Sequence, residues 1–216
     1  MAIKWAGSGN REGEDFEILN SLCAEVDTLM NEVRQDTPGY FPFFGNERAS
    51  VSQFVAASAR LGWLPLAEWR VKKRKWDIAQ NGEYPEISNL SCDEIVNGYQ
   101  DFWCSTKNGC FAIEFKQISI SDIKKSNLSA INLLLKNNRN HAISEMKRYD
   151  ETEADHIFCC SIIPVVSDIL RNDIKIIANN WEWLCHLTSG DADDGRLGYE
   201  VYFCFASMVK ARSGSN

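Results

Sequence analysis

The chain has 216 residues, of which 44% are hydrophobic and 25% are charged, the composition of an ordinary globular protein. This length fits one domain, or one domain with a sizeable insertion, and allows a substantial core. No apolar run is long enough to span a bilayer, and no signal-peptide segment follows the first residues. We therefore expect a cytoplasmic protein with no membrane partner.

The net charge of −7 argues against a non-specific DNA-binding protein, because the surface of such a protein is usually basic. The densest basic cluster spans residues 70–75. A solvated strand end is the commoner explanation for such a run, and contact with phosphate is the alternative. The candidate nucleic-acid-binding residues of this cluster are Arg70, Lys72, Lys73 and Arg74.

The eight cysteines are better explained as reduced thiols than as a disulfide framework, because the chain is long and has no signal segment. No C-x-x-C pair occurs, and His141, His156 and His186 lack the spacing of zinc or iron–sulfur ligands. Most of the thiols are expected to be buried, since they lie in apolar runs.

The first third of the chain predicts two helices and a strand. Residues 1–12 are polar and without periodicity, which predicts a flexible arm. From residue 14 to about 33, apolar residues recur at the spacing of an amphipathic helix. The loop over residues 37–46 is rich in aromatic residues, for which burial is favoured over a base-stacking or partner-binding surface. A second helix is expected over residues 49–61, and a strand over 65–76.

An amphipathic β-hairpin is predicted around Asn108-Gly109, the dipeptide that best fits a two-residue type I′ turn because both positions need positive φ. This turn places Asp101 opposite Lys116 and diagonal to Glu114, so that all three emerge on one face. The other face is apolar and suited to packing beneath a helix. It carries Phe102, Cys104, Thr106, Phe111, Ile113 and Phe115.

The polar face of the hairpin has the chemistry of a metal site. Asp101 and Glu114 lie on a diagonal of roughly 7–8 Å, which two carboxylates can span by holding one cation between them. Mg²⁺ or Mn²⁺ would suit carboxylate oxygens and retained waters, and Lys116 would orient an attacking water or neutralise developing charge. A solvated face with a weak ion pair is the common alternative for E-x-K on an amphipathic strand.

At these residues the sequence resembles the PD-(D/E)xK nuclease superfamily, which carries an acidic residue on one strand and (D/E)-x-K on the next. The resemblance implies a restriction-endonuclease-like α/β sandwich, with a mixed central sheet flanked by helices. It also implies Mg²⁺-dependent hydrolysis of phosphodiester bonds in nucleic acid, with DNA the expected substrate. Asp101, Glu114 and the Phe115 carbonyl would bind the metal, and Lys116 would complete the catalytic set.

The resemblance also suggests accessory acids. The superfamily often places one on its first helix, where Asp15 shares the apolar stripe, although a favourable helix dipole is the commoner explanation. Glu68, on the strand before the hairpin, would add a third carboxylate. Asp77 is a rival for the first catalytic acid, but the polar residues 80–97 separate it from Glu114.

Downstream of the hairpin, a helix or two short ones are predicted over residues 128–149. Within this segment, Ala142, Glu145 and Tyr149 resemble the A-x-x-Q-x-x-x-Y helix of the RecB-like branch of the superfamily, with glutamate in place of glutamine. An exposed i,i+4 pair is the default explanation.

The last third predicts a continuous apolar strand over residues 156–166, as for a central strand covered on both faces. Residues 168–187 are predicted to be helical, residues 190–198 an acidic loop and residues 199–208 the last strand, before a disordered tail over 210–216. The buried residues of this helix are expected to be Trp181, Trp183 and Leu184.

These elements predict a single α/β nuclease-like domain over residues 13–209, with an insertion at about 37–98. The leading hypothesis is a Mg²⁺-dependent nuclease. The alternative is a catalytically inactive protein of the same fold, acting as a binding or regulatory module in a defence or phage-related system. A homodimer, which would decide between single- and double-strand cutting, stays open.

Overall fold

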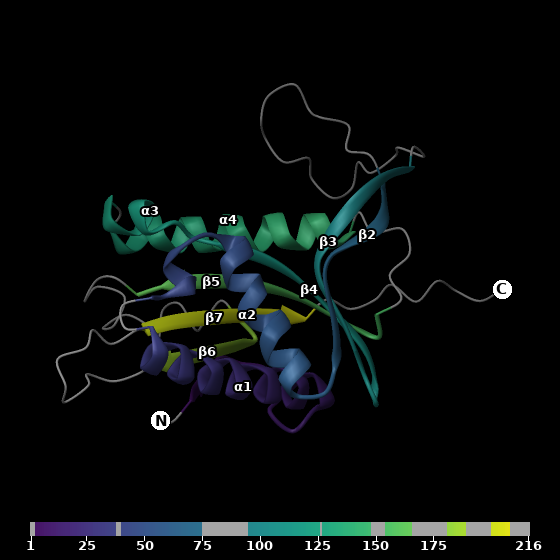
Figure 1. Ribbon diagram of the computed structural model, residues 1–216. Helices are drawn as coiled ribbons and strands as arrows, with labels where there is room; N and C mark the ends of the chain where they lie inside the picture. Colours follow the sequence, from purple (N-terminus) through teal and green to yellow (C-terminus); the bar gives the residue numbers. More distant parts are fainter. Residues whose placement is uncertain are drawn as a thin grey trace.

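The structure of the protein, a computed structural model, describes residues 3–37, 40–74, 95–125, 127–147, 154–165, 181–188 and 200–207. These residues form an α/β arrangement around a seven-stranded mixed sheet, with helices against both faces (Figure 1). The α/β class and the mixed central sheet flanked by helices are confirmed.

The structure describes five helices, one of them a 3-10 helix, and seven strands. The helices are α1 (Glu14–Asp36), η1 (Pro42–Phe44, a 3-10 helix), α2 (Glu47–Arg60), α3 (Ile120–Lys125) and α4 (Leu128–Lys147). The strands are β1 (Lys4–Ala6), β2 (Leu64–Arg74), β3 (Ile95–Thr106), β4 (Gly109–Gln117), β5 (His156–Pro164), β6 (Trp183–Thr188) and β7 (Glu200–Ser207). The sheet order is β1-β6-β7-β5-β4-β3-β2, in which only β4 and β5 are parallel. A parallel pair needs a crossover, and α4 lies within it.

Helices α1 and α2 cover one face of the sheet because their apolar residues repeat at helical spacing. In α1 the buried stripe consists of Leu19, Leu22, Cys23, Val26 and Met30. Helix α2 begins at an N-cap, where the Asn46 side chain accepts a hydrogen bond from the Ala49 N–H at 2.9 Å. The ring of Phe54 in α2 packs on Phe115 of β4, with centroids 4.8 Å apart. Both helices predicted in this part of the chain are confirmed.

Helix α4 covers the opposite face. Ile131 and Ala142 of this helix are buried with Cys159 of β5 and Cys204 of β7. The next residue of β5, Cys160, points the other way into the core beneath α1 and α2. Strand β5 is therefore buried on both faces, as its unbroken apolar run predicted.

The hairpin of β3 and β4 forms as predicted, but its turn is displaced by one residue. Lys107 and Asn108 are the two loop residues, and Thr106 pairs with Gly109. The displacement shifts the register by two residues relative to the predicted one. Because side chains alternate with a period of two, the apolar and polar faces stay as predicted.

Gly109 explains the position of the turn. Its φ is 139°, a conformation that L residues rarely adopt. A Cβ added to it would lie 2.8 Å from an Oδ2 of Asp155, and that carboxylate accepts a hydrogen bond from the Cys110 N–H at 2.9 Å. Glycine is therefore needed at this position for two reasons: the turn requires a positive φ, and a side chain would displace Asp155.

Two expected elements differ in the structure. Within the predicted arm over residues 1–12, β1 pairs with β6, and the Trp5 ring packs on Phe16 of α1 with centroids 5.0 Å apart. Residues 183–188, predicted to end a helix, form β6 between β1 and β7. A short apolar run does not distinguish a helix from a strand, and pairing with two neighbours decides for the strand. The burial expected for Trp181, Trp183 and Leu184 is confirmed.

The predicted insertion at about 37–98 supplies η1, α2 and β2 to the body of the protein. Asp77, Tyr149, the acidic loop over 190–198 and the tail over 210–216 lie outside the described residues. Among the residues that are described, no helix is long and apolar enough to cross a membrane.

Gly109→Ala is expected to lower the free energy of unfolding by about 2 kcal/mol or more, because the backbone is strained for an L residue and the Cβ would displace Asp155. Gly62→Ala is the matched control, since Gly62 has a φ of 75° and nothing within 4 Å of an added Cβ. This control should lose only about 1 kcal/mol. Urea denaturation measures both, and equal losses would contradict a constraint from Asp155.

The thiols should differ sharply in reactivity. Burial raises the pKa of Cys104 and Cys159 to about 12, and it raises the pKa of Cys160 and Cys204 as well. Only Cys110 among the described cysteines is partly exposed. In a Cys92→Ser background, a thiol reagent at pH 8 should therefore modify Cys110 rapidly and the others only after unfolding. A Cys110→Ser variant that still reacts rapidly would contradict this expectation.

Candidate functional site

The candidate site lies where β3 separates from β4. The paired register of the hairpin ends at Phe102 and Ile113. Beyond this pair, β3 continues alongside β2, and Figure 1 shows these two strands curving away together while β4 runs back beneath α4. The N–H of Phe115 donates to an Oδ2 of Asp101 at 2.8 Å, so a side chain takes the place of a ladder partner. This bond orients the Asp101 carboxylate at the notch between the two strands.

Lys116 gathers three carboxylates at this notch. Its Nζ lies 3.2 Å from an Oε1 of Glu114, 3.7 Å from an Oδ2 of Asp101 and 3.9 Å from an Oε1 of Glu47. It also donates to the carbonyl oxygen of Phe115 at 2.7 Å. The structure therefore brings together Asp101, Glu114, Phe115 and Lys116, the residues that the sequence pattern predicted for the site.

Glu47, in the first turn of α2, was not predicted for the site. Its Oε2 accepts the backbone N–H of Gln117 at 3.0 Å. The Gln117 side chain in turn donates to the Phe43 carbonyl at 2.9 Å and accepts from the Ser50 hydroxyl at 2.6 Å. These contacts fasten the start of α2 to the end of β4. In the sequence, an acid that follows an N-cap residue looks like any favourable helix start, so it gave no signal of this role.

Burial and neighbouring charges have opposite effects on the pKa of Lys116 in this cluster. The side chains of Glu114 and Lys116 are only 4% and 16% exposed. Burial lowers the pKa of Lys116, but the negative charges of Glu114, Asp101 and Glu47 raise it by more, so the pKa lies above its ordinary value. Lys116 is therefore a cation at neutral pH. For Glu47, burial raises the pKa and Asp101 adds to the effect, while Lys116 and the Gln117 N–H act in the opposite direction.

The donor atoms of the cluster suit a hard divalent cation. Three carboxylates and the Phe115 carbonyl are oxygen ligands of the kind that Mg²⁺ and Mn²⁺ take. Within the described part of the chain, however, no group of three or more His, Cys, Asp and Glu side chains is placed to hold a metal ion. The Lys116 ammonium is the cation that the carboxylates share in this structure. The donor atoms thus suit a metal by their chemistry, while their arrangement here is centred on the Lys116 ammonium.

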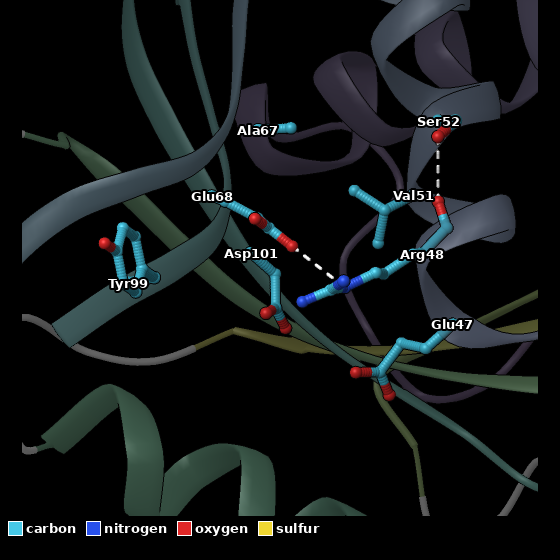
Figure 2. Close-up of a pocket in the computed structure, with 8 residues that line it drawn as sticks. All are labelled: Glu47, Arg48, Val51, Ser52, Ala67, Glu68, Tyr99 and Asp101. Atoms are coloured by element: carbon cyan, nitrogen blue, oxygen red, sulfur yellow. Dashed lines mark hydrogen bonds and ion pairs between the residues drawn. The ribbon is translucent and has the colours of Figure 1, made fainter.

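An open cavity of about 700 Å³ adjoins the cluster, between α2 and the pair of strands β2 and β3 (Figure 2). Its lining consists of Glu47, Arg48, Val51, Ser52, Ala67, Glu68, Tyr99 and Asp101. The guanidinium of Arg48 reaches from α2 towards the strands, where its Nε pairs with an Oε1 of Glu68 at 3.0 Å. Figure 2 shows this guanidinium close to Asp101. A positively charged group therefore stands at the entrance to the carboxylate cluster.

No family model, curated protein or solved structure matches this chain. The site is therefore interpreted from its own geometry and chemistry.

Glu68, the predicted third carboxylate, lies in the same cavity as Asp101. The pairs Ala67 with Phe102 and Trp69 with Gln100 place it opposite Asp101 in the register. Its φ of 50° is in the left-handed region, which is strained for an L residue, and it lets Ala67 and Glu68 both line the cavity. The Glu68 carboxylate pairs with Arg48, whereas the carboxylates that gather around Lys116 belong to Asp101, Glu114 and Glu47.

Asp15 does not join the cluster. Its Oδ1 lies 2.6 Å from the Nδ1 of His156, at the start of β5. His156 stands beside Phe111 in the sheet, five residues before Lys116 on β4, and thus roughly 16 Å from it along the strand. Asp15 therefore ties α1 to β5, and the acid that a helix brings to the site is Glu47 of α2.

The remaining candidate residues, Glu145 and the basic residues of β2, are not among the side chains that contact Lys116. Glu145 of α4 has its carboxylate 4.0 Å from the Nε2 of His141, one turn earlier, as an i,i+4 pair. Arg70 is exposed on β2. The other basic candidates, Lys72, Lys73 and Arg74, continue the same strand alongside β3.

Lys116→Met is expected to lower the free energy of unfolding at pH 7 by about 3 kcal/mol in EDTA, because the nearly buried Glu114 carboxylate loses its cation. The double variant Lys116→Met/Glu114→Gln should recover at least about 1 kcal/mol of this loss. Urea denaturation measures the cycle. Lys107→Met in the exposed hairpin turn is the control and should change stability by less than about 0.5 kcal/mol. Strictly additive effects of the two site substitutions would contradict the coupling.

Proposed function

We propose that this protein is a metal-dependent nuclease of the PD-(D/E)xK type that hydrolyses phosphodiester bonds in nucleic acid. The observation that carries the proposal is the convergence at one notch of Asp101 from β3, Glu114 and Lys116 from β4, and Glu47 from α2. Three carboxylates and a lysine drawn from three elements are hard to explain as a solvated strand face, since Glu114 and Lys116 are nearly buried.

The order of elements supports the same assignment. Helices α1 and α2 precede the antiparallel strands β2, β3 and β4, and α4 then leads to β5, which is parallel to β4. This order agrees with the restriction-endonuclease-like sandwich that the resemblance implies. Asp101 and Glu114 lie just beyond the point where the pairing of β3 with β4 ends.

The chemistry assigned to each residue follows from its position. Asp101, Glu114 and Glu47, with the Phe115 carbonyl, would hold Mg²⁺ or Mn²⁺, which when bound supplies a Lewis acid and lowers the pKa of a bound water. The Phe115 N–H fixes the orientation of Asp101. Lys116 stays next to these acids and would position the attacking water or neutralise charge on the phosphate.

Arg48 would supply a second positive charge. Its side chain is 86% exposed in the cavity and is held at one end by Glu68, so its other nitrogens can meet a phosphate. Arg48 of α2 and Arg70 of β2 place positive charge beside the carboxylates, in a chain whose net charge is −7. The expected partner is therefore nucleic acid, with DNA the first candidate, and the free thiols suit the cytoplasm.

One observation favours the alternative of a catalytically inactive protein of this fold that binds or regulates a partner. The ammonium of Lys116 already balances the carboxylates, so the cluster holds together without a metal. Titration with Mn²⁺ separates the two: binding that is lost in Asp101→Asn supports the nuclease, and no binding supports the regulatory module.

The test is cleavage of linear, circular and single-stranded DNA and of RNA, with Mg²⁺ or Mn²⁺. Asp101→Asn keeps an oxygen that can accept the Phe115 N–H but removes the charge. This variant should lower the rate by roughly 100-fold or more, equal to about 3 kcal/mol of transition-state stabilisation. Glu32→Gln, far from the notch and paired with Arg60, is the matched control and should cleave normally. Full activity in Asp101→Asn, or in EDTA, would contradict the proposal.

A further inference from the structure

Two exposed aromatic rings lie on β2 and β3, the strands that line the cavity beside the candidate site. Tyr99 is 62% exposed and lines the same cavity as Asp101. Trp69, on the neighbouring strand, is 45% exposed. Its ring stacks on Trp103, with centroids 6.3 Å apart and planes 26° apart. Large aromatic residues are usually buried, so two exposed ones beside a polar site need an explanation.

The rings are placed along the strand that carries the first acid. Tyr99, Asp101 and Trp103 alternate on β3, so their side chains belong to the same side of that strand. In Figure 2, Tyr99 stands to the left of Asp101, and the Arg48 guanidinium reaches from α2 towards Asp101 and Glu68. An exposed ring, that of Tyr99, therefore lies on one side of Asp101 along β3. On the other side, Trp103 is partly buried and carries the exposed ring of Trp69 stacked on it.

Positive charges accompany these rings. Arg70 is exposed and stands opposite Tyr99 in the β2–β3 register. Arg48 reaches towards Asp101 from α2 in Figure 2, and the Nζ of Lys116 lies 3.7 Å from the Oδ2 of Asp101. Arginines beside stacking platforms are the combination with which proteins hold single strands, since cations track the phosphates and every base offers a flat face.

We propose that the preferred substrate is single-stranded nucleic acid, whose unpaired bases stack on Tyr99 and Trp69 while a phosphate lies over the carboxylate cluster. The inference rests on the proposed function and specifies the substrate of the same site. The bases of a duplex are already stacked on one another and offer no free face to these rings. Stacking also tolerates any base, so cutting would show little dependence on sequence.

Binding is tested in EDTA, where cleavage does not occur, by fluorescence anisotropy with short labelled oligonucleotides of mixed sequence. Single-stranded DNA, single-stranded RNA and duplex DNA are compared on the full chain. The wild type should bind one or both single strands at least about tenfold more tightly than duplex. Tyr99→Ala should weaken this binding by about tenfold, whereas Tyr99→Phe, which keeps the ring, should bind like the wild type. Tyr40→Ala removes another exposed ring, 50% exposed and outside the cavity lining, and should change nothing.

The outcomes separate this inference from the nuclease proposal. Tyr99-dependent binding of single strands by a protein that cleaves nothing with Mg²⁺ or Mn²⁺ would support the inference and contradict the nuclease. Cleavage of duplex as fast as single strands, with equal activity in Tyr99→Ala, would overturn the inference and leave the nuclease standing. Binding that falls equally in Tyr99→Ala and Tyr40→Ala, or no binding of any oligonucleotide, would also overturn it.

Discussion

The separation of β3 from β4 is the constraint on which the site depends. Where two paired strands separate, backbone groups of each strand lose their hydrogen-bond partners. A buried backbone N–H without a partner destabilises the folded state. Asp101 meets this need for the N–H of Phe115, so one carboxylate both ends the hairpin ladder and faces the site. On the other edge of β4, pairing with β5 continues to Gln117. The last residues of β4 are thus paired with β5 on one edge, and on the other edge side chains take the place of a strand: Asp101 from β3 and Glu47 from α2.

The charged side chains at this notch form a network, and no single ion pair within it would offset the cost of burying Glu114 and Lys116. Removing Glu114 and Lys116 from water carries a large desolvation penalty, which close contact with further charges and hydrogen bonds must offset. Asp101, Glu47 and the Phe115 carbonyl provide those contacts. The result is a preorganised set of oxygen atoms with excess negative charge around one ammonium. The stability of the network therefore depends on the positive charge of Lys116.

Local patterns in the sequence predicted the three long helices α1, α2 and α4, most strands and both faces of the hairpin, but not η1, α3, β1 or β6. The turn at Lys107 and Asn108 shifts the register by two residues, which a period of two tolerates. The acid that a helix contributes to the site could not be predicted in this way. Asp15 and Glu47 both stand in the first turn of a helix, so the local sequence does not distinguish them. The choice between them depends on the contacts of Gln117 with α2 and η1, which join residues 67 to 74 positions apart in the chain. No local periodicity reports contacts of that range.

The backbone at Glu68 shows that the cavity is not shaped by stability alone. A glutamate in the left-handed region is disfavoured by about 1 kcal/mol or more. Its ion pair with Arg48 joins two largely exposed side chains, and such pairs contribute at most about 1 kcal/mol. The pair therefore does not clearly offset the strain. What the strained residue does provide is position, since it stands opposite Asp101 and holds the Arg48 guanidinium over the cavity. Strain retained without a matching gain in stability is typical of a binding or catalytic site, and here it lies next to Asp101 of the carboxylate cluster.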